Sequence, residues 1–75
     1  MNTREFMKEL RMHTLIGDIH SCGMDGLSKK GIRDVLFNRY VNSVETPLTK
    51  EEFNSTLDRE YKKVEAWRER RLKNA

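Results

Sequence analysis

Three stretches of this 75-residue chain share one pattern: an apolar residue, a polar residue next to it, and a second apolar residue four places beyond the polar one. A helix leaves its first backbone N–H groups without partners, and a Ser, Thr or Asn side chain at the preceding position accepts a hydrogen bond from one of them. The two flanking apolar residues then pack together as a hydrophobic staple. The pattern therefore predicts three helix starts, at MNTREF (1–6), LSKKGI (27–32) and LTKEEF (48–53).

The predicted caps of these helices are Asn2, Ser28 and Thr49. A glutamate follows Asn2 and Thr49 three residues later, whereas Gly31 occupies that position after Ser28. Such a glutamate accepts a hydrogen bond from the backbone N–H of the cap residue and completes a capping box. We therefore expect capping boxes at the first and third helix starts only.

The predicted helices end at residues that break helical geometry. Gly17, Gly23 and Gly26 interrupt the segment after the first start, and Pro47 disfavours helical geometry at the residue before it. No segment alternates apolar and polar residues for long enough to predict a strand. We expect an all-α fold, a small three-helix module with a long C-terminal helix, in one domain of residues 1–75. The expected helices span about 3–18, 29–44 and 50–73, and the first ends between residues 16 and 20.

Length and composition restrict the class of protein. A chain this short buries only about 60% of the surface that its unfolded form exposes, so its core is small. Its single cysteine, Cys22, cannot form an internal disulfide, which favours a reducing compartment, and we expect a cytoplasmic protein. No apolar run reaches the roughly 20 residues of a membrane span, and charge begins at Arg4, unlike in a secretory signal. We expect no membrane association.

The apolar residues of the predicted helices differ in arrangement. Those of the second helix surround more than half of its circumference, which predicts a central helix. The first helix has Phe6, Met7 and Leu10 on one side and its later apolar residues nearly opposite. This division predicts a bend near Met12, a surrounded second half, or packing against a second copy of the chain. The third helix has its apolar residues within an arc of about 140°: Phe53, Leu57, Tyr61, Val64, Trp67 and Leu72.

The C-terminal end is the basic part of the chain. Residues 59–75 contain seven Lys or Arg and three Asp or Glu, a net charge of +4, whereas residues 1–58 contain eight and nine, a net charge of −1. The third predicted helix is about 36 Å long, so its last turns should project beyond the shorter helices. The purely structural interpretation is that the aliphatic parts of its arginine side chains cover the edge of the core. The alternative is a binding surface, because Trp and Arg dominate interface hot spots; its residues are Trp67, Arg68, Arg71 and Leu72.

The sequence offers little support for catalysis or for a bound cofactor. Asp18, His20, Cys22 and Asp25 lie close together, but a structural zinc site takes four ligands from spaced pairs, and no second pair is present. Cys22 and His20 have no apparent third member of a catalytic group. His13 falls on the apolar side of the first helix, which predicts a packed histidine. We expect no metal, no cofactor and no enzymatic activity.

The leading hypothesis is a small non-enzymatic helical interaction protein, which binds a larger partner protein and modulates it as an inhibitor or accessory subunit. The alternative is a nucleic-acid-binding accessory protein that contacts phosphates with its basic C-terminal helix. A homodimer, in which a second copy covers the exposed apolar sides, is the third candidate. The residues of the nucleic-acid alternative are Lys62, Lys63, Arg68, Arg70 and Arg71.

Overall fold

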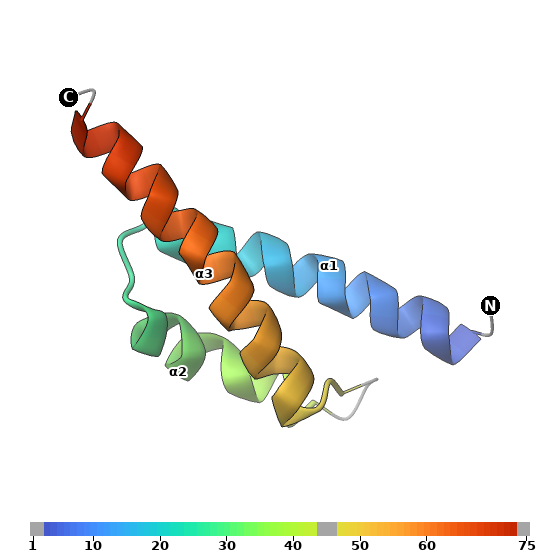
Figure 1. Ribbon diagram of the computed structural model, residues 1–75. Coiled ribbons are helices and arrows are strands. Elements are labelled where there is room, and N and C mark those ends of the chain that lie inside the picture. Colours follow the sequence, from blue (N-terminus) through green and yellow to red (C-terminus); the bar gives the residue numbers. More distant parts are fainter. Residues whose placement is uncertain (1–2, 44–46, 74–75) are drawn as a thin grey trace.

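The structure is a computed structural model that describes residues 3–43 and 47–73. This part of the chain contains three helices, whose arrangement is shown in Figure 1. The described residues contain no strand. The predicted all-α fold is therefore confirmed, as is the position of the longest helix at the C-terminus. The helices are α1 (Thr3–Met24), α2 (Lys29–Tyr40) and α3 (Lys50–Lys73).

Two of the three predicted caps lie in the described residues, and both are present. Ser28 Oγ accepts a hydrogen bond from the backbone N–H of Gly31 at 3.1 Å. At α3, Thr49 Oγ1 accepts from the N–H of Glu52 at 3.0 Å, and Glu52 Oε1 accepts from the N–H of Thr49 at 2.9 Å. This reciprocal pair is the predicted capping box. The cap predicted at Asn2 lies outside the described residues.

The first helix is longer than the sequence predicts, because α1 continues through Gly17 and Gly23 to Met24. Two residues after Met24, Gly26 has a φ of +93°, the left-handed conformation that glycine adopts without steric cost and that stops the helix. The N–H of Gly26 donates to the carbonyl of Gly23, and that of Leu27 to the carbonyl of Cys22, each at 3.1 Å. These two bonds form a Schellman motif. Only one of the three glycines predicted to interrupt this segment therefore ends the helix.

The second helix is shorter than predicted and ends at Tyr40 instead of residue 44. In a longer helix the Tyr40 carbonyl would accept from the N–H four residues later. It accepts instead from the N–H of Leu48 at 2.8 Å. A tertiary hydrogen bond therefore ends α2.

The core forms where the three helices meet, and all three pairs of helices are in contact. Tyr40 is completely buried, and its hydroxyl donates to the Asp18 carboxylate, which joins α2 to α1. The prediction that α2 is central is wrong, because α1 makes the more extensive contacts and Val35 of α2 is 53% exposed. The central buried side chains are Leu15, Ile19, Ile32, Leu36, Tyr40, Leu48, Phe53 and Leu57.

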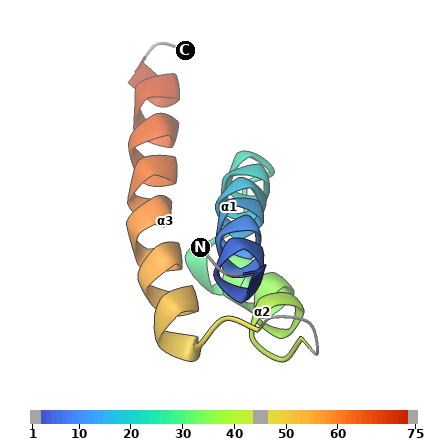
Figure 2. The same cartoon turned by 90° about the vertical axis from the view of Figure 1, so that its right-hand side faces the viewer.

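The molecule is elongated. Its radius of gyration is 13.5 Å, whereas a compact domain of this length has one of about 11 Å. Figure 1 shows α1 and α3 crossing, with the N-terminal part of α1 and the C-terminal part of α3 extending away from the crossing in different directions, and Figure 2 shows the two helices side by side. The predicted division of the apolar residues of α1 into two groups agrees with this shape. Leu15 and Ile19 are buried at the crossing, whereas Phe6 is 53% exposed on the extending part.

Candidate functional site

The end of α1 lies against α3 because Gly23 has no side chain. A Cβ atom added at Gly23 would lie 2.6 Å from Cγ1 and 2.8 Å from Cγ2 of Val64, which is closer than carbon atoms pack. Both residues are buried. The close contact places the last turn of α1 beside the C-terminal half of α3.

Arg68 holds the two helices together next to this contact. Its Nη2 donates to the backbone carbonyls of Gly23 at 2.6 Å and of Leu27 at 2.7 Å, and its Nη1 donates to Tyr61 Oη at 3.0 Å. A cation at this position also interacts favourably with the negative C-terminal end of the α1 dipole. Arg68, predicted as a partner-binding residue, is therefore half-buried and engaged within its own chain.

A groove of about 810 Å³ opens between the end of α1 and the last turns of α3. Trp67 is half-buried in it, and the Arg71 guanidinium carbon lies 5.0 Å from the centroid of the indole ring. Met24 is 62% exposed and Leu72 is 78% exposed. We call this feature the α1–α3 groove, and its lining residues are Gly23, Met24, Gly26, Trp67, Arg68, Arg70, Arg71 and Leu72.

All four predicted partner-binding residues line the α1–α3 groove. Two further residues with large side chains, Met24 and Arg70, were not predicted to belong with them. Met24 was missed because the predicted first helix ended before it. Arg70 appeared only in the nucleic-acid alternative. The helical period shows which residues of α3 share a face. Met24 joins them only because the end of α1 packs against α3.

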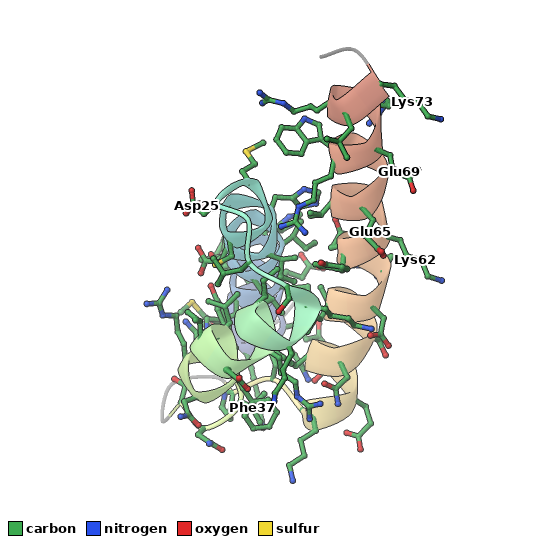
Figure 3. The ribbon with its side chains drawn as sticks, turned by 90° about the vertical axis from the view of Figure 1, so that its left-hand side faces the viewer. Asp25, Phe37, Lys62, Glu65, Glu69 and Lys73 are labelled. Carbon is green, nitrogen blue, oxygen red and sulfur yellow. The ribbon has the colours of Figure 1, made fainter. Side chains whose placement is uncertain are left out.

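The cations of the nucleic-acid alternative do not lie on one surface. Figure 3 shows Lys62 on the face of α3 that points away from the other helices, together with Glu69. Lys63 forms an ion pair with Glu60 at 3.2 Å and lines a smaller pocket with Met24, Trp67 and Arg70. The other three, Arg68, Arg70 and Arg71, line the α1–α3 groove.

Sequence reasoning also missed a buried carboxylate, Glu60, whose side chain is 3% exposed. Its Oε1 lies 2.9 Å from His20 Nε2, and its Oε2 lies 2.9 Å from Arg59 Nε and 3.2 Å from Lys63 Nζ. Burial disfavours the ionised form, but the hydrogen bonds from His20, Arg59 and Lys63 outweigh it and lower the pKa of Glu60 to about 2. Two of these partners lie within three residues on α3, and His20 attaches the cluster to α1.

The side chains near Cys22 give no support for nucleophilic catalysis. Burial raises the pKa of the Cys22 thiol, and the carboxylates of Asp18 and Asp25 raise it further. The thiol therefore stays protonated at neutral pH, whereas the thiolate is the reactive form. His13 is exposed, so the prediction that it packs against the apolar side of the helix is wrong.

Among residues 3–43 and 47–73, no three His, Cys, Asp or Glu side chains gather closely enough to hold a metal ion. No helix in this part of the chain is both long enough and apolar enough to cross a bilayer. Comparison of the chain with models of protein families, with curated proteins and with solved structures finds no match.

Proposed function

We propose that this chain is a small non-enzymatic interaction protein that binds a larger partner protein through the α1–α3 groove. The observation that carries this proposal is the exposure of Met24 and Leu72 beside the half-buried ring of Trp67. Contiguous exposed apolar side chains on a small protein are typical of an interaction site. A chain of 75 residues suits an inhibitor or an accessory subunit, which acts by occupying a surface of its partner.

The way in which the groove is built supports this role. The Gly23–Val64 contact and the three hydrogen bonds of Arg68 determine the spacing of α1 and α3. A surface held in place before binding loses less conformational entropy when the partner docks. Trp67 and Arg71 are also of the residue types that contribute most to the binding energy of protein interfaces.

A photo-crosslinking experiment tests the proposal. A photoreactive amino acid replaces Leu72, which lines the groove, and in a matched control it replaces Lys62, which Figure 3 shows on the face of α3 that points away from the other helices. In a lysate of the source cells, we expect a protein to crosslink to position 72 and not to position 62. The substitution Trp67→Ala should abolish that product. Identical products at both positions would contradict the proposal.

The nucleic-acid alternative predicts a different response to salt. Binding to phosphates releases counterions, so the affinity for duplex DNA or RNA would fall steeply as the salt concentration rises. The position of Lys62 outside the groove and the ion pair of Lys63 with Glu60 favour the protein partner. Titration of the chain with duplex DNA and RNA at low salt should show no binding. A steep salt-dependent affinity would favour the alternative.

A further inference from the structure

The α1–α3 groove combines positive charge with apolar surface. Three of its lining residues are arginines, and none is an aspartate or glutamate. Figure 3 shows two neighbouring acidic side chains turned away: Asp25 points away from α3, and Glu69 lies on the outer face of α3. Glu65 lies about two turns before Leu72 on α3 and does not line the groove. Another nearby carboxylate, Glu60, already has three cationic or imidazole partners. Among residues 3–43 and 47–73, no carboxylate therefore lines the groove to neutralise its positive charge.

The three arginines are not equivalent. Arg68 donates hydrogen bonds to the carbonyls of Gly23 and Leu27 and to the Tyr61 hydroxyl, so it holds the two sides of the groove in place. Arg70 and Arg71 are exposed. Arg71 lies over the Trp67 ring, and a guanidinium stacked in this way keeps its N–H donors available at the edge of its plane. Two guanidinium groups thus remain to receive an acidic ligand.

We propose that the α1–α3 groove binds an acidic amphipathic segment of the partner protein, with carboxylates on Arg70 and Arg71 and an apolar side chain against Met24, Trp67 and Leu72. This inference rests on the proposed function and specifies the chemistry of the partner. Guanidinium groups bind carboxylates with two parallel hydrogen bonds, which orient the bound carboxylate in addition to attracting its charge. The adjacent apolar side chains require an apolar group on the same segment.

The apolar side chains also distinguish a protein segment from a nucleic-acid backbone. A duplex presents phosphates and sugars at its surface, and these would leave Met24 and Leu72, which are 62% and 78% exposed, without an apolar partner. An acidic segment with Leu, Phe or Trp residues on one face would pair with the arginines and cover the exposed apolar side chains at the same time. Charge and hydropathy together therefore favour the acidic peptide.

Selection from a phage-displayed library of random peptides on the full chain tests the inference. We expect the enriched peptides to combine Asp or Glu with large apolar residues. Enrichment of basic or uncharged peptides, or no enrichment, would overturn the inference. The affinity of synthetic versions can be measured from the fluorescence of Trp67, because it is the chain's only tryptophan and lies in the groove.

Two double variants with the same change in net charge make the measurement specific. Arg70→Glu with Arg71→Glu should weaken peptide binding by about tenfold or more. Lys62→Glu with Lys73→Glu changes residues that Figure 3 shows outside the groove, and should leave the affinity within about threefold. Peptide versions with Glu→Lys, or with their apolar residues replaced by serine, should also lose affinity. Equal losses in both double variants, or displacement of the peptide by duplex DNA at physiological salt, would overturn the inference.

The inference and the proposed function can fail separately. If no protein crosslinks through position 72, the proposed function fails. If a protein does crosslink there and its crosslinked segment is basic or lacks large apolar residues, the proposed function stands and the acidic-segment inference fails.

Discussion

Gly17 and Gly23 lie six residues apart on α1 and have opposite relations to their surroundings. Nothing approaches within 4 Å of the position that a Cβ atom would occupy at Gly17, whereas at Gly23 the Val64 side chain already fills that position. Both are helical, so each costs the helix about 1 kcal/mol relative to alanine. Only Gly23 offsets this cost, because it permits the close approach of α1 and α3.

The two substitutions to alanine should therefore change stability in opposite directions. Gly17→Ala should raise the free energy of unfolding by about 0.5–1 kcal/mol. Gly23→Ala should lower it by about 1–2 kcal/mol, because the clash with Val64 exceeds the gain in helix propensity. Urea denaturation followed by circular dichroism measures both. Two changes of the same sign would contradict the contact at Gly23.

Arg68 should differ from its neighbour Arg71 in its effect on stability. Arg68→Met removes the donor to the carbonyls of Gly23 and Leu27 and should lower the free energy of unfolding by about 2–3 kcal/mol. Arg71→Met removes only a surface contact with Trp67, and its effect should stay within about 1 kcal/mol. Thermal and urea denaturation compare the two. Equal losses would show that Arg68 does not hold the helices together.

Glu60 should make stability depend on pH in the acidic range. Its pKa falls from the ordinary 4.5 to about 2 in the folded chain, so its ionised form stabilises the fold above pH 4.5. That contribution, up to about 3 kcal/mol, is lost as the pH falls from about 4.5 to about 2. The free energy of unfolding of wild type should therefore decrease across this window, and Glu60→Gln should flatten the decrease. An unchanged profile in Glu60→Gln would assign the acid sensitivity to other carboxylates.

At the scale of the helix, local signals explain the starts better than the stops. The caps at Ser28 and Thr49 need only side chains within three residues, and both are present as predicted. The ends of α1 and α2 depend on partners that are distant in sequence or on a left-handed glycine. Local propensity indicated breaks at all three glycines of this region, but the contacts of α1 with its neighbours favour a continuous helix through two of them.

The capping box of α3 should contribute measurably to stability. Thr49→Ala leaves the N–H of Glu52 without its side-chain acceptor and should lower the free energy of unfolding by about 1 kcal/mol. Ser55→Ala, at an exposed position within the same helix, serves as the control and should change it by less than about 0.5 kcal/mol. Urea denaturation at neutral pH tests the pair. A loss in the control as large as in Thr49→Ala would argue against a specific cap.

At the scale of the whole molecule, one crossing of α1 and α3 leaves two parts extending from a small core. Its overall dimensions are 46 × 25 × 17 Å. The extending part of α1 exposes Phe6, Met7 and Leu10, while that of α3 forms one side of the α1–α3 groove. The two surfaces lie at different ends of the molecule, so one partner segment need not cover both.

The isolated chain should be monomeric at micromolar concentration. The α1 surface consists of three partly exposed side chains, Phe6, Met7 and Leu10, whereas a stable interface takes about 20–30 residues from each partner. Sedimentation equilibrium should give the mass of one chain, and small-angle scattering should give a radius of gyration above that of a compact domain of this length. A dimeric mass that reverts to a monomer in Phe6→Ser with Leu10→Ser would instead support pairing of α1 with a second copy.

The sequence by itself determines the fold class, two of the helix starts in the described residues, and the placement of Trp67, Arg68, Arg71 and Leu72 on one side of the last helix. These features depend on hydrogen bonds within one turn and on a period of 3.6 residues, and both are visible in a string of residues. Only the tertiary structure decides that Arg68 belongs to the scaffold, that Glu60 is buried with His20, and that Met24 joins the groove. Each of these depends on residues about 40 positions apart, whose proximity follows from the contact of Gly23 with Val64 and from no local pattern.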